Sequence, residues 1–274
     1  MSLYYFRKLI LILNKEFKKY LTQTVRIFLF IAVLFTLQSC ISSDKTEIKT
    51  DDPEEALKVA KKNYNKGDYL QAIDDFSYIK LRFSGTKIID ESQYYFGMCY
   101  FQRKEYILAA YEFDYLIKNY PTSEFMPKAR YQLSMCYYNL SPAYALDQTY
   151  TYNAITEFIT FLELYPNDIK APDAEAKIKE LRNKLAFKDL RSGILYYNMD
   201  NYKAAIVYFD NVLENYFDGD YADDALYWKI ETLIKRKKFE DAKTEIERFE
   251  KKFPTSEHLK RVTEIKNSLP STSG

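Results

Sequence analysis

The chain has 274 residues, with 40 Lys and Arg against 39 Asp and Glu, one His, three Cys and only six Gly. A Gly share of about 2%, against a usual share of roughly 7%, excludes a fold built on tight hairpins whose turns need positive φ angles. A hydrophobic fraction of 47%, with 27 Tyr and 19 Phe, excludes a disordered chain.

Residues 27–37 form an uncharged apolar run that follows a basic stretch. The run is shorter than the roughly 20 residues that a membrane-spanning helix needs, and its length is typical of the apolar part of a signal peptide. The residues that follow, Leu-Gln-Ser-Cys40, resemble the bacterial lipobox, whose Cys is acylated and becomes the new N-terminus. We therefore predict a lipoprotein signal peptide over residues 1–39 and lipidation of Cys40. The alternative is a short buried helix with an incidental Cys.

Residues 40–52 are predicted to form a flexible, lipid-anchored tether, because the segment after Cys40 is polar and unpatterned.

The predicted signal peptide is basic, so the chain that remains after its removal has a small negative net charge. This charge argues against nucleic acid as a partner. Ile41, rather than Asp, follows the Cys. By resemblance to a sorting rule of some Gram-negative bacteria, this favours the outer over the inner membrane. We expect the anchored protein on the periplasmic face, although the sequence does not fix the leaflet.

Five blocks with one internal spacing follow the predicted tether. Each pairs a small residue with a large apolar one four positions later: Ala72 and Phe76, Ala109 and Phe113, Ala154 and Phe158, Ala205 and Phe209, and Ala242 and Ile246. A further aromatic residue comes seven positions after each pair. Extra residues separate the third block from its neighbours. Repetition of this kind indicates an array of similar structural units.

Each unit is predicted to contain two helices. Steps of three and four between apolar positions are typical of a helical stripe, and Pro121, Pro166 and Pro254 follow the last aromatic residue of their blocks, where a helix must end. Ser, Thr or Asp beyond each Pro can cap the next helix. A second stripe lies upstream of each block, most clearly at residues 94–101, and a short polar turn separates the two.

The copy around Ala109 resembles a tetratricopeptide repeat. Gly97, Tyr100, Phe113 and Pro121 lie at the offsets from Ala109 at which that repeat carries Gly, two aromatic residues and Pro. The resemblance implies an all-α fold. That fold is a right-handed superhelix (α-solenoid) of about five tetratricopeptide-like helix-turn-helix repeats, with a C-terminal capping helix.

Residues 53–168 are assigned to N-terminal repeats 1–3, and residues 169–274 to C-terminal repeats 4–5 and the capping helix. A helix over about residues 174–199 is long for a single repeat and is predicted to join the two groups rigidly. The capping helix is expected over about residues 256–268, because the open end of a solenoid must be covered.

No residue pattern for catalysis, a cofactor or a metal is found, so the chain is not expected to be an enzyme. His258 has no Cys or carboxylate at a convincing ligand spacing and is expected to be a surface residue. Cys99 and Cys136 occupy equivalent positions of neighbouring repeats. Equivalent helices lie about 8–10 Å apart, beyond the roughly 7 Å that a disulfide tolerates, so two buried thiols are expected.

Most of the Tyr residues are expected to pack between helices. A few aromatic residues on first helices can instead line a groove that takes an extended or helical segment of a partner. We single out Tyr64, Tyr95, Tyr100 and Phe101 for such a groove, although packing is the favoured interpretation for any one of them.

The lipobox-like Cys, the five repeats and the segment Leu-Ser-Pro-Ala-Tyr-Ala-Leu-Asp-Gln-Thr at residues 140–149 together resemble the BamD family, lipoproteins of the outer-membrane β-barrel assembly machinery. The resemblance implies a scaffold. Its N-terminal repeats would bind unfolded outer-membrane β-barrel proteins. Its C-terminal repeats would dock on the periplasmic repeat domains of the barrel-forming assembly subunit, alongside other assembly lipoproteins. For this second surface we single out Tyr227, Trp228 and Lys235.

Two other classes of repeat lipoprotein remain open. One is a coordinator of cell-envelope or peptidoglycan synthesis, and the other is a glycan-binding lipoprotein of the SusD type. Proteins of the SusD type are nearly twice as long as this chain, and they insert a sugar-binding region between repeats, so length counts against that alternative.

Overall fold

A computed structural model describes residues 46–270 of the chain. This range contains eleven α-helices and no β-strand. The helices are α2 (Pro53–Asn65), α3 (Tyr69–Arg82), α4 (Ile89–Gln102), α5 (Tyr106–Asn119), α6 (Met126–Leu140), α7 (Thr149–Leu164), α8 (Ala171–Asn198), α9 (Tyr202–Asn215), α10 (Ala222–Lys235), α11 (Phe239–Lys252) and α12 (Leu259–Ser268). The predicted signal peptide and Cys40 lie outside the described residues.

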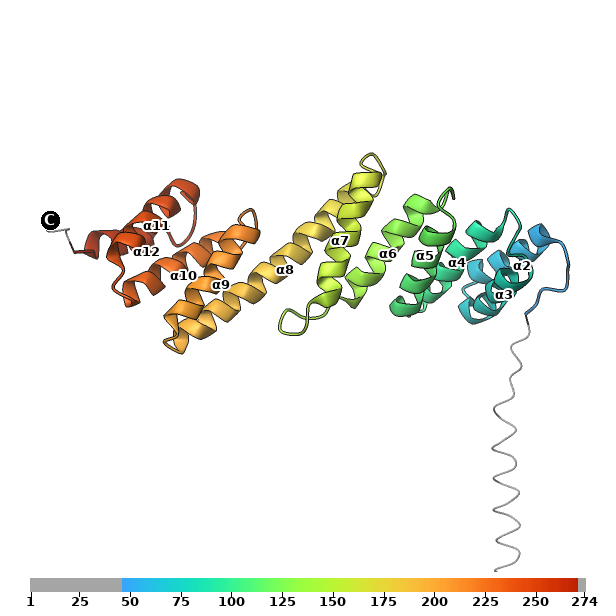
Figure 1. The fold of residues 1–274 in the computed structure, drawn as a ribbon, viewed down its shortest axis with the longest axis horizontal. Coiled ribbons are helices and arrows are strands. Elements are labelled where there is room, and N and C mark those ends of the chain that lie inside the picture. Colours follow the sequence, from blue (N-terminus) through green and yellow to red (C-terminus); the bar gives the residue numbers. More distant parts are fainter. Residues whose placement is uncertain (1–45, 271–274) are drawn as a thin grey trace, which may run out of the picture. The chain divides into compact units, whose positions relative to one another are not determined.

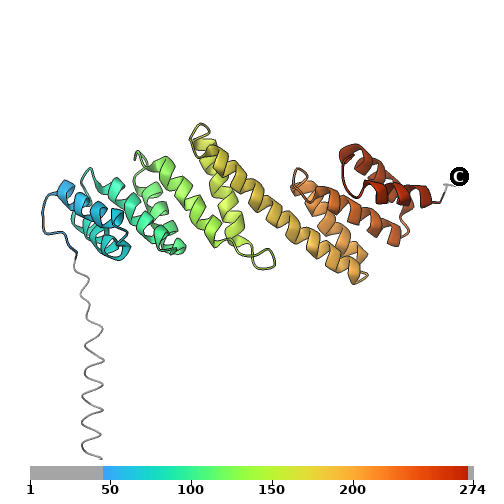
Figure 2. The ribbon, with the colours of Figure 1, turned by 180° about the vertical axis from the view of Figure 1, so that it is seen from behind.

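Each helix packs mainly on the helix before it and the helix after it (Figure 1). The same succession is seen from behind in Figure 2. Beyond direct neighbours, first helices of adjacent repeats also meet, as α2 does with α4 and α8 with α10. Contacts limited to neighbours define a solenoid. The prediction of an all-α solenoid of helical repeats is therefore confirmed.

The connections between repeats are built alike. After each aromatic residue that ends a second helix, the backbone N–H three positions on donates to that residue's carbonyl. The five bonds are Thr86 to Phe83 (3.1 Å), Ser123 to Tyr120 (3.0 Å), Asp168 to Tyr165 (3.1 Å), Gly219 to Tyr216 (3.0 Å) and Ser256 to Phe253 (3.2 Å). The predicted capping residues Ser123, Asp168 and Ser256 accept from the backbone N–H two positions on. They therefore shape the turn before the next helix.

Left-handed residues form the turns inside four of the repeats. Gly67, Lys104, Asp200 and Lys237 have φ angles of 82°, 62°, 57° and 59°. After each of them, the next N–H reaches back to a carbonyl of the first helix, as Lys238 does to Leu233 at 2.9 Å. This is the 6→1 bond of a Schellman motif.

The repeated Ala and aromatic positions form the core. Ala72, Ala109, Ala154, Ala205 and Ala242 are fully buried, as are the large residues paired with them. In the second repeat, a Cβ at Gly97 would lie 2.7 Å from Cε1 of Phe113. Gly is therefore needed here because the ring of the second helix lies directly against the backbone of the first.

Helix α8 is shared by two repeats. The prediction of a long helix at about residues 174–199 is confirmed by its bounds, Ala171–Asn198. Its first half places Ala174 and Leu181 in one core cluster with Phe158 of α7. Its second half places Leu185 and Leu190 in another cluster with the core of α9. One continuous helix thus supports the repeats on either side of it.

Residues 47–51 lie against the first repeat. Ile48 is buried in the core, the Glu47 N–H donates to Asp75 Oδ1 at 2.9 Å, and Asn63 donates to the other Asp75 oxygen at 2.8 Å. Asp75 is itself fully buried. The last residues of the predicted tether therefore belong to the folded body.

The two described cysteines, Cys99 and Cys136, are free and buried, as predicted. Burial raises the pKa of both thiols well above the usual range, so neither is a reactive thiolate at neutral pH.

Of the helices between residues 46 and 270, none combines the length and the apolar character that crossing a membrane requires.

Candidate protein-binding surfaces

Aromatic side chains form a continuous row across the first repeats. We call Tyr69, Tyr64, Tyr95, Tyr94 and Phe125 the N-terminal row. Successive ring centroids along it are 5.6, 5.2, 5.5 and 5.2 Å apart. The row runs from the start of α3 over α2 and α4 to the residue before α6, so it connects the first helices of three repeats.

Of the four predicted groove residues, the structure brings Tyr64 and Tyr95 together. Tyr100 packs instead on Phe96, with ring centroids 5.3 Å apart, and Phe101 packs on Tyr106 at 5.4 Å. All four predicted residues are half-buried. Each therefore contributes to helix packing and also presents part of its ring to solvent.

The N-terminal row carries little net charge. Lys61 lies 5.0 Å above the Tyr95 ring, but its ammonium group also pairs with Glu91, and that hydrogen bond raises the pKa of Lys61. Burial raises the pKa of Tyr94 to about 12, so its hydroxyl stays protonated at neutral pH. Phe125 at the end of the row is buried, so the four Tyr residues present the accessible part, which offers aromatic area and hydroxyl groups rather than net charge.

A second row crosses the last repeats. We call Tyr202, Tyr197, Trp228, Tyr227 and His258 the C-terminal row. The first three steps have centroid separations of 5.7, 5.2 and 5.5 Å, and the His258 ring lies flat on Tyr227 at 4.3 Å with an interplanar angle of 2°. All five side chains are half-buried. The row runs from the start of α9 over α8 and α10 to the residue before α12.

Of the three predicted docking residues, two belong to the C-terminal row and one does not. Tyr227 and Trp228 are adjacent members of the C-terminal row, whereas Lys235 is exposed at the end of α10. A different lysine of this helix, Lys229, is largely buried, with 13% of its side chain exposed. Lys229 pairs with Asp210 at 2.7 Å and with Glu245 at 2.6 Å, and so ties α10 to α9 and α11.

Spacing along the sequence indicates no carboxylate partner for His258, but the structure places one beside it. Its Nε2 atom lies 2.8 Å from Oδ1 of Asp224. Asp224 is in the first turn of α10, and His258 directly precedes α12. The two are far apart in sequence and meet because α12 folds back towards the fifth repeat, a contact that spacing along the chain cannot reveal.

The segment between α6 and α7 is organised by one buried side chain. Gln148 Nε2 donates to the carbonyls of Ala143 (3.0 Å), Tyr144 (3.3 Å) and Leu146 (3.0 Å), and Thr151 donates to Gln148 Oε1 at 2.7 Å. The amide thus holds the loop in one conformation. Gln148, one of the residues that mark this segment in the sequence, therefore has a structural role.

This loop and α8 border a pocket that the sequence analysis missed. Tyr144 lies against Phe187 with centroids 4.7 Å apart, and Phe187 lies against Tyr221 at 5.1 Å. Lys184 lines the same pocket and donates to the hydroxyl of Ser141 at 2.7 Å. Burial lowers the pKa of Lys184. No sequence pattern connects these residues, because they come from three separate segments.

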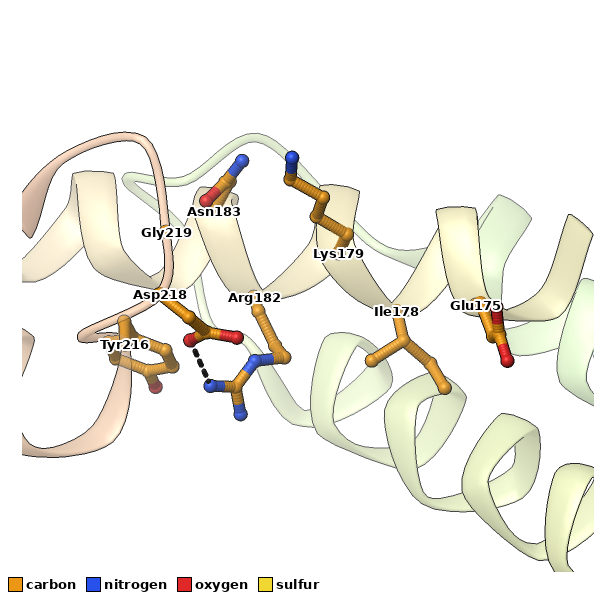
Figure 3. A pocket seen from close by; sticks show the side chains of 8 residues that line it. All are labelled: Glu175, Ile178, Lys179, Arg182, Asn183, Tyr216, Asp218 and Gly219. Carbon is orange, nitrogen blue, oxygen red and sulfur yellow. Dashed lines mark hydrogen bonds and ion pairs between the residues drawn. The ribbon is translucent and has the colours of Figure 1, made fainter. Parts of the chain in front are cut away.

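A smaller pocket of about 270 Å³ lies where α8 meets the α9–α10 loop (Figure 3). Arg182 points towards Asp218 in this view, and its Nη2 donates to that carboxylate at 2.9 Å and to the carbonyl of Asn215 at 2.8 Å. The guanidinium group is therefore already engaged within the chain. The pocket joins α8 to the fourth repeat rather than offering a free cation to an anionic ligand.

Second helices also expose apolar side chains that the sequence analysis did not single out. Tyr111 and Ile107 of α5 are 62% and 61% exposed. Together with Tyr150 of α7 they line a shallow pocket. The sequence does indicate these exposed side chains. Apolar residues of α5 extend beyond the helix face that its core residues occupy.

Comparisons with known proteins agree with this architecture. A family model described as outer membrane lipoprotein (YfiO) matches residues 49–237, and a tetratricopeptide-repeat model matches residues 224–256. No curated protein sequence matches the chain.

The solved structures that match the chain share little sequence with it. A tetratricopeptide-repeat protein of Bacteroides fragilis is 17% identical with a TM-score of 0.46, over 80% of this chain and 100% of that one. A thermophilic repeat protein of Thermus thermophilus is 13% identical with a TM-score of 0.35, over 78% and 98%. The apo form of RapI is 14% identical with a TM-score of 0.32, over 80% and 78%.

Proposed function

Because the chain belongs to the YfiO family of outer membrane lipoproteins, we propose that it is a lipid-anchored scaffold of the outer-membrane β-barrel assembly machinery. In this proposal it binds unfolded outer-membrane β-barrel proteins and the barrel-forming subunit, and it supports barrel folding and membrane insertion. It acts by holding other polypeptides and not as an enzyme.

The family match over residues 49–237 carries this proposal. The matched region runs from just before α2 to just past α10, so it includes the first four repeats, the first helix of the fifth and the loop that Gln148 organises. A generic repeat match would support only a protein-binding fold. The lipoprotein family connects that fold with the outer membrane.

The two aromatic rows suit such a scaffold physically. An unfolded barrel strand alternates apolar and polar side chains, and aromatic anchors provide large contact area at low cost in conformational entropy. We assign unfolded substrates to the N-terminal row. We assign the barrel-forming subunit to the C-terminal row, where Lys235 adds an exposed cation at the end of α10.

Affinity purification from detergent-solubilised membranes tests the proposal. The wild-type chain should retrieve a large outer-membrane barrel protein with periplasmic repeat domains. The double variant Trp228→Phe, Lys235→Glu should retrieve less of it. Lys251→Glu, which changes an exposed lysine of α11, is the matched control and should behave as wild type.

Recovery of peptidoglycan-synthesis enzymes in place of the barrel protein would overturn the proposal in favour of an envelope coordinator. Depletion of the chain distinguishes the remaining alternative. Many outer-membrane barrels should decline together, whereas a defect confined to the uptake of one nutrient would indicate a substrate-binding lipoprotein.

The anchor is tested separately. Two acyl chains hold a protein stably at a membrane, whereas one holds it only marginally. Cys40→Ser should therefore move the protein from the membrane fraction to the soluble periplasmic fraction. Unchanged sedimentation of this variant would contradict lipidation of Cys40.

A further inference from the structure

Three potential metal ligands converge beside the C-terminal row. Asp224, Glu257 and His258 each offer one ligand atom, and all three atoms lie within 4.8 Å of one another. His258 Nε2 and Asp224 Oδ1 are already 2.8 Å apart. Ligand atoms around a tetrahedral zinc ion, with bonds of about 2.0–2.2 Å, are separated by roughly 3.4 Å. Small adjustments of these side chains therefore suffice to place all three on one ion.

The surroundings hold the imidazole in position. The flat contact with Tyr227, at 4.3 Å and 2°, fixes the plane of the His258 ring. The His258 backbone N–H donates to Ser256 Oγ at 3.2 Å, and the Ser256 hydroxyl in turn donates to Asp223 at 2.7 Å. Glu257 is exposed, so its carboxylate is free to turn towards an ion.

We propose that Asp224, Glu257 and His258 bind a divalent transition-metal ion of the zinc type. An imidazole with two carboxylates suits zinc better than the hard cations Mg²⁺ and Ca²⁺, which prefer oxygen ligands alone. Three protein ligands leave the fourth tetrahedral position for water.

The ion would cross-link two elements at the C-terminal end of the repeat array. Asp224 belongs to α10, whereas Glu257 and His258 belong to the turn before α12, so a shared ion joins the fifth repeat to the capping helix. Metal binding to the folded state alone stabilises that state by mass action. The bound ion therefore stabilises the packing of α12 on the fifth repeat.

The single His of the chain gives this proposal a direct readout. The full chain, purified without a histidine tag and labelled with ¹⁵N, is titrated with ZnCl₂ and followed through the imidazole nitrogen signals in a long-range ¹H–¹⁵N spectrum. The His258 Nε2 signal should shift and saturate at micromolar zinc. The midpoint of thermal unfolding should rise over the same concentration range.

Four variants decide between a metal site and a simple hydrogen bond. Asp224→Asn, Glu257→Gln and His258→Gln should each weaken zinc binding at least about tenfold, because even the loss of an outer-shell partner costs 10–100-fold. The zinc dependence of the thermal midpoint measures binding in all variants, including His258→Gln, which has no imidazole signal. Glu264→Gln, which changes an exposed carboxylate of α12, should bind as wild type. If the His258 signals do not move up to millimolar zinc, or if the three variants bind zinc as tightly as wild type, the proposal is wrong.

Discussion

At the scale of single residues, the repeat pattern acts through close contact between a small residue and a ring. Gly97 is the clearest case, because the Phe113 ring occupies the space that a side chain at position 97 would need. The Ala residues of the second helices are buried for the same reason, since two helices meet there at short distance.

Gly97→Ala is expected to lower the free energy of unfolding by about 1 kcal/mol. Overpacking costs roughly 1–3 kcal/mol, and the better helix propensity of Ala returns up to about 1 kcal/mol. Urea denaturation measures the change. Gly85→Ala is the control, because a Cβ there meets nothing within 4 Å, and it should stay within about 0.5 kcal/mol of wild type. A Gly97→Ala protein as stable as wild type would refute the steric argument.

The sequence was sufficient to predict which aromatic residues cluster near first helices, but not which ones form a row. Tyr64 and Tyr95 were singled out and do contact each other, whereas Tyr100 and Phe101 turn to Phe96 and Tyr106. Adjacent helical residues diverge by about 100°, so the orientation of neighbouring helices decides the outcome. The contact between His258 and Asp224 depends on tertiary packing in the same way.

At the scale of elements, the turns inside the repeats differ in how well their residues suit the backbone. The first repeat has Gly67 at its left-handed position, whereas the fifth has Lys237 with a φ of 59°. A side chain in this region carries a steric cost that Gly avoids. The predicted polar turns therefore have the right location. Their left-handed conformation was not predictable where Gly is missing, because Lys and Asp rarely adopt it.

Lys237→Gly is expected to raise the free energy of unfolding by about 0.5–1 kcal/mol, because it relieves the left-handed strain at a helix C-terminus. The reciprocal change Gly67→Lys should destabilise the protein by a similar amount. Chemical denaturation of both variants is the measurement. If Lys237→Gly lowers the free energy of unfolding instead, the Lys237 side chain makes a contact that stabilises the protein by more than the left-handed backbone conformation destabilises it.

At the scale of the whole molecule, stability should be distributed along the array. The described helices contact mainly their neighbours, and stability in such a chain is close to a sum of repeat and interface terms. The all-α repeat architecture was predictable from sequence because the same local pattern recurs, and the long helix was predictable because the chain between the third and fourth blocks is longer than one repeat needs. The docking of residues 47–51 on Asp75 was not predictable, because it has no counterpart in the other repeats.

Phe209→Ala, which removes a fully buried ring of the fourth repeat, is expected to cost about 3–5 kcal/mol locally. Hydrogen exchange should rise in α8, α9 and α10 and stay near wild-type values in α2 and α3. Phe76→Ala in the first repeat is the matched variant and should give the reverse distribution. Equal loss of protection in all helices in both variants would show a single cooperative unit instead.

Helix α8 makes the scaffold a spacer of set length. Its 28 residues extend over about 42 Å at 1.5 Å per residue, and no break divides the part that supports the third repeat from the part that supports the fourth. Two polypeptides held before and after this helix cannot slide towards each other unless the helix itself bends. If the proposed scaffold binds one polypeptide on each side of α8, the length of this helix sets the distance between them.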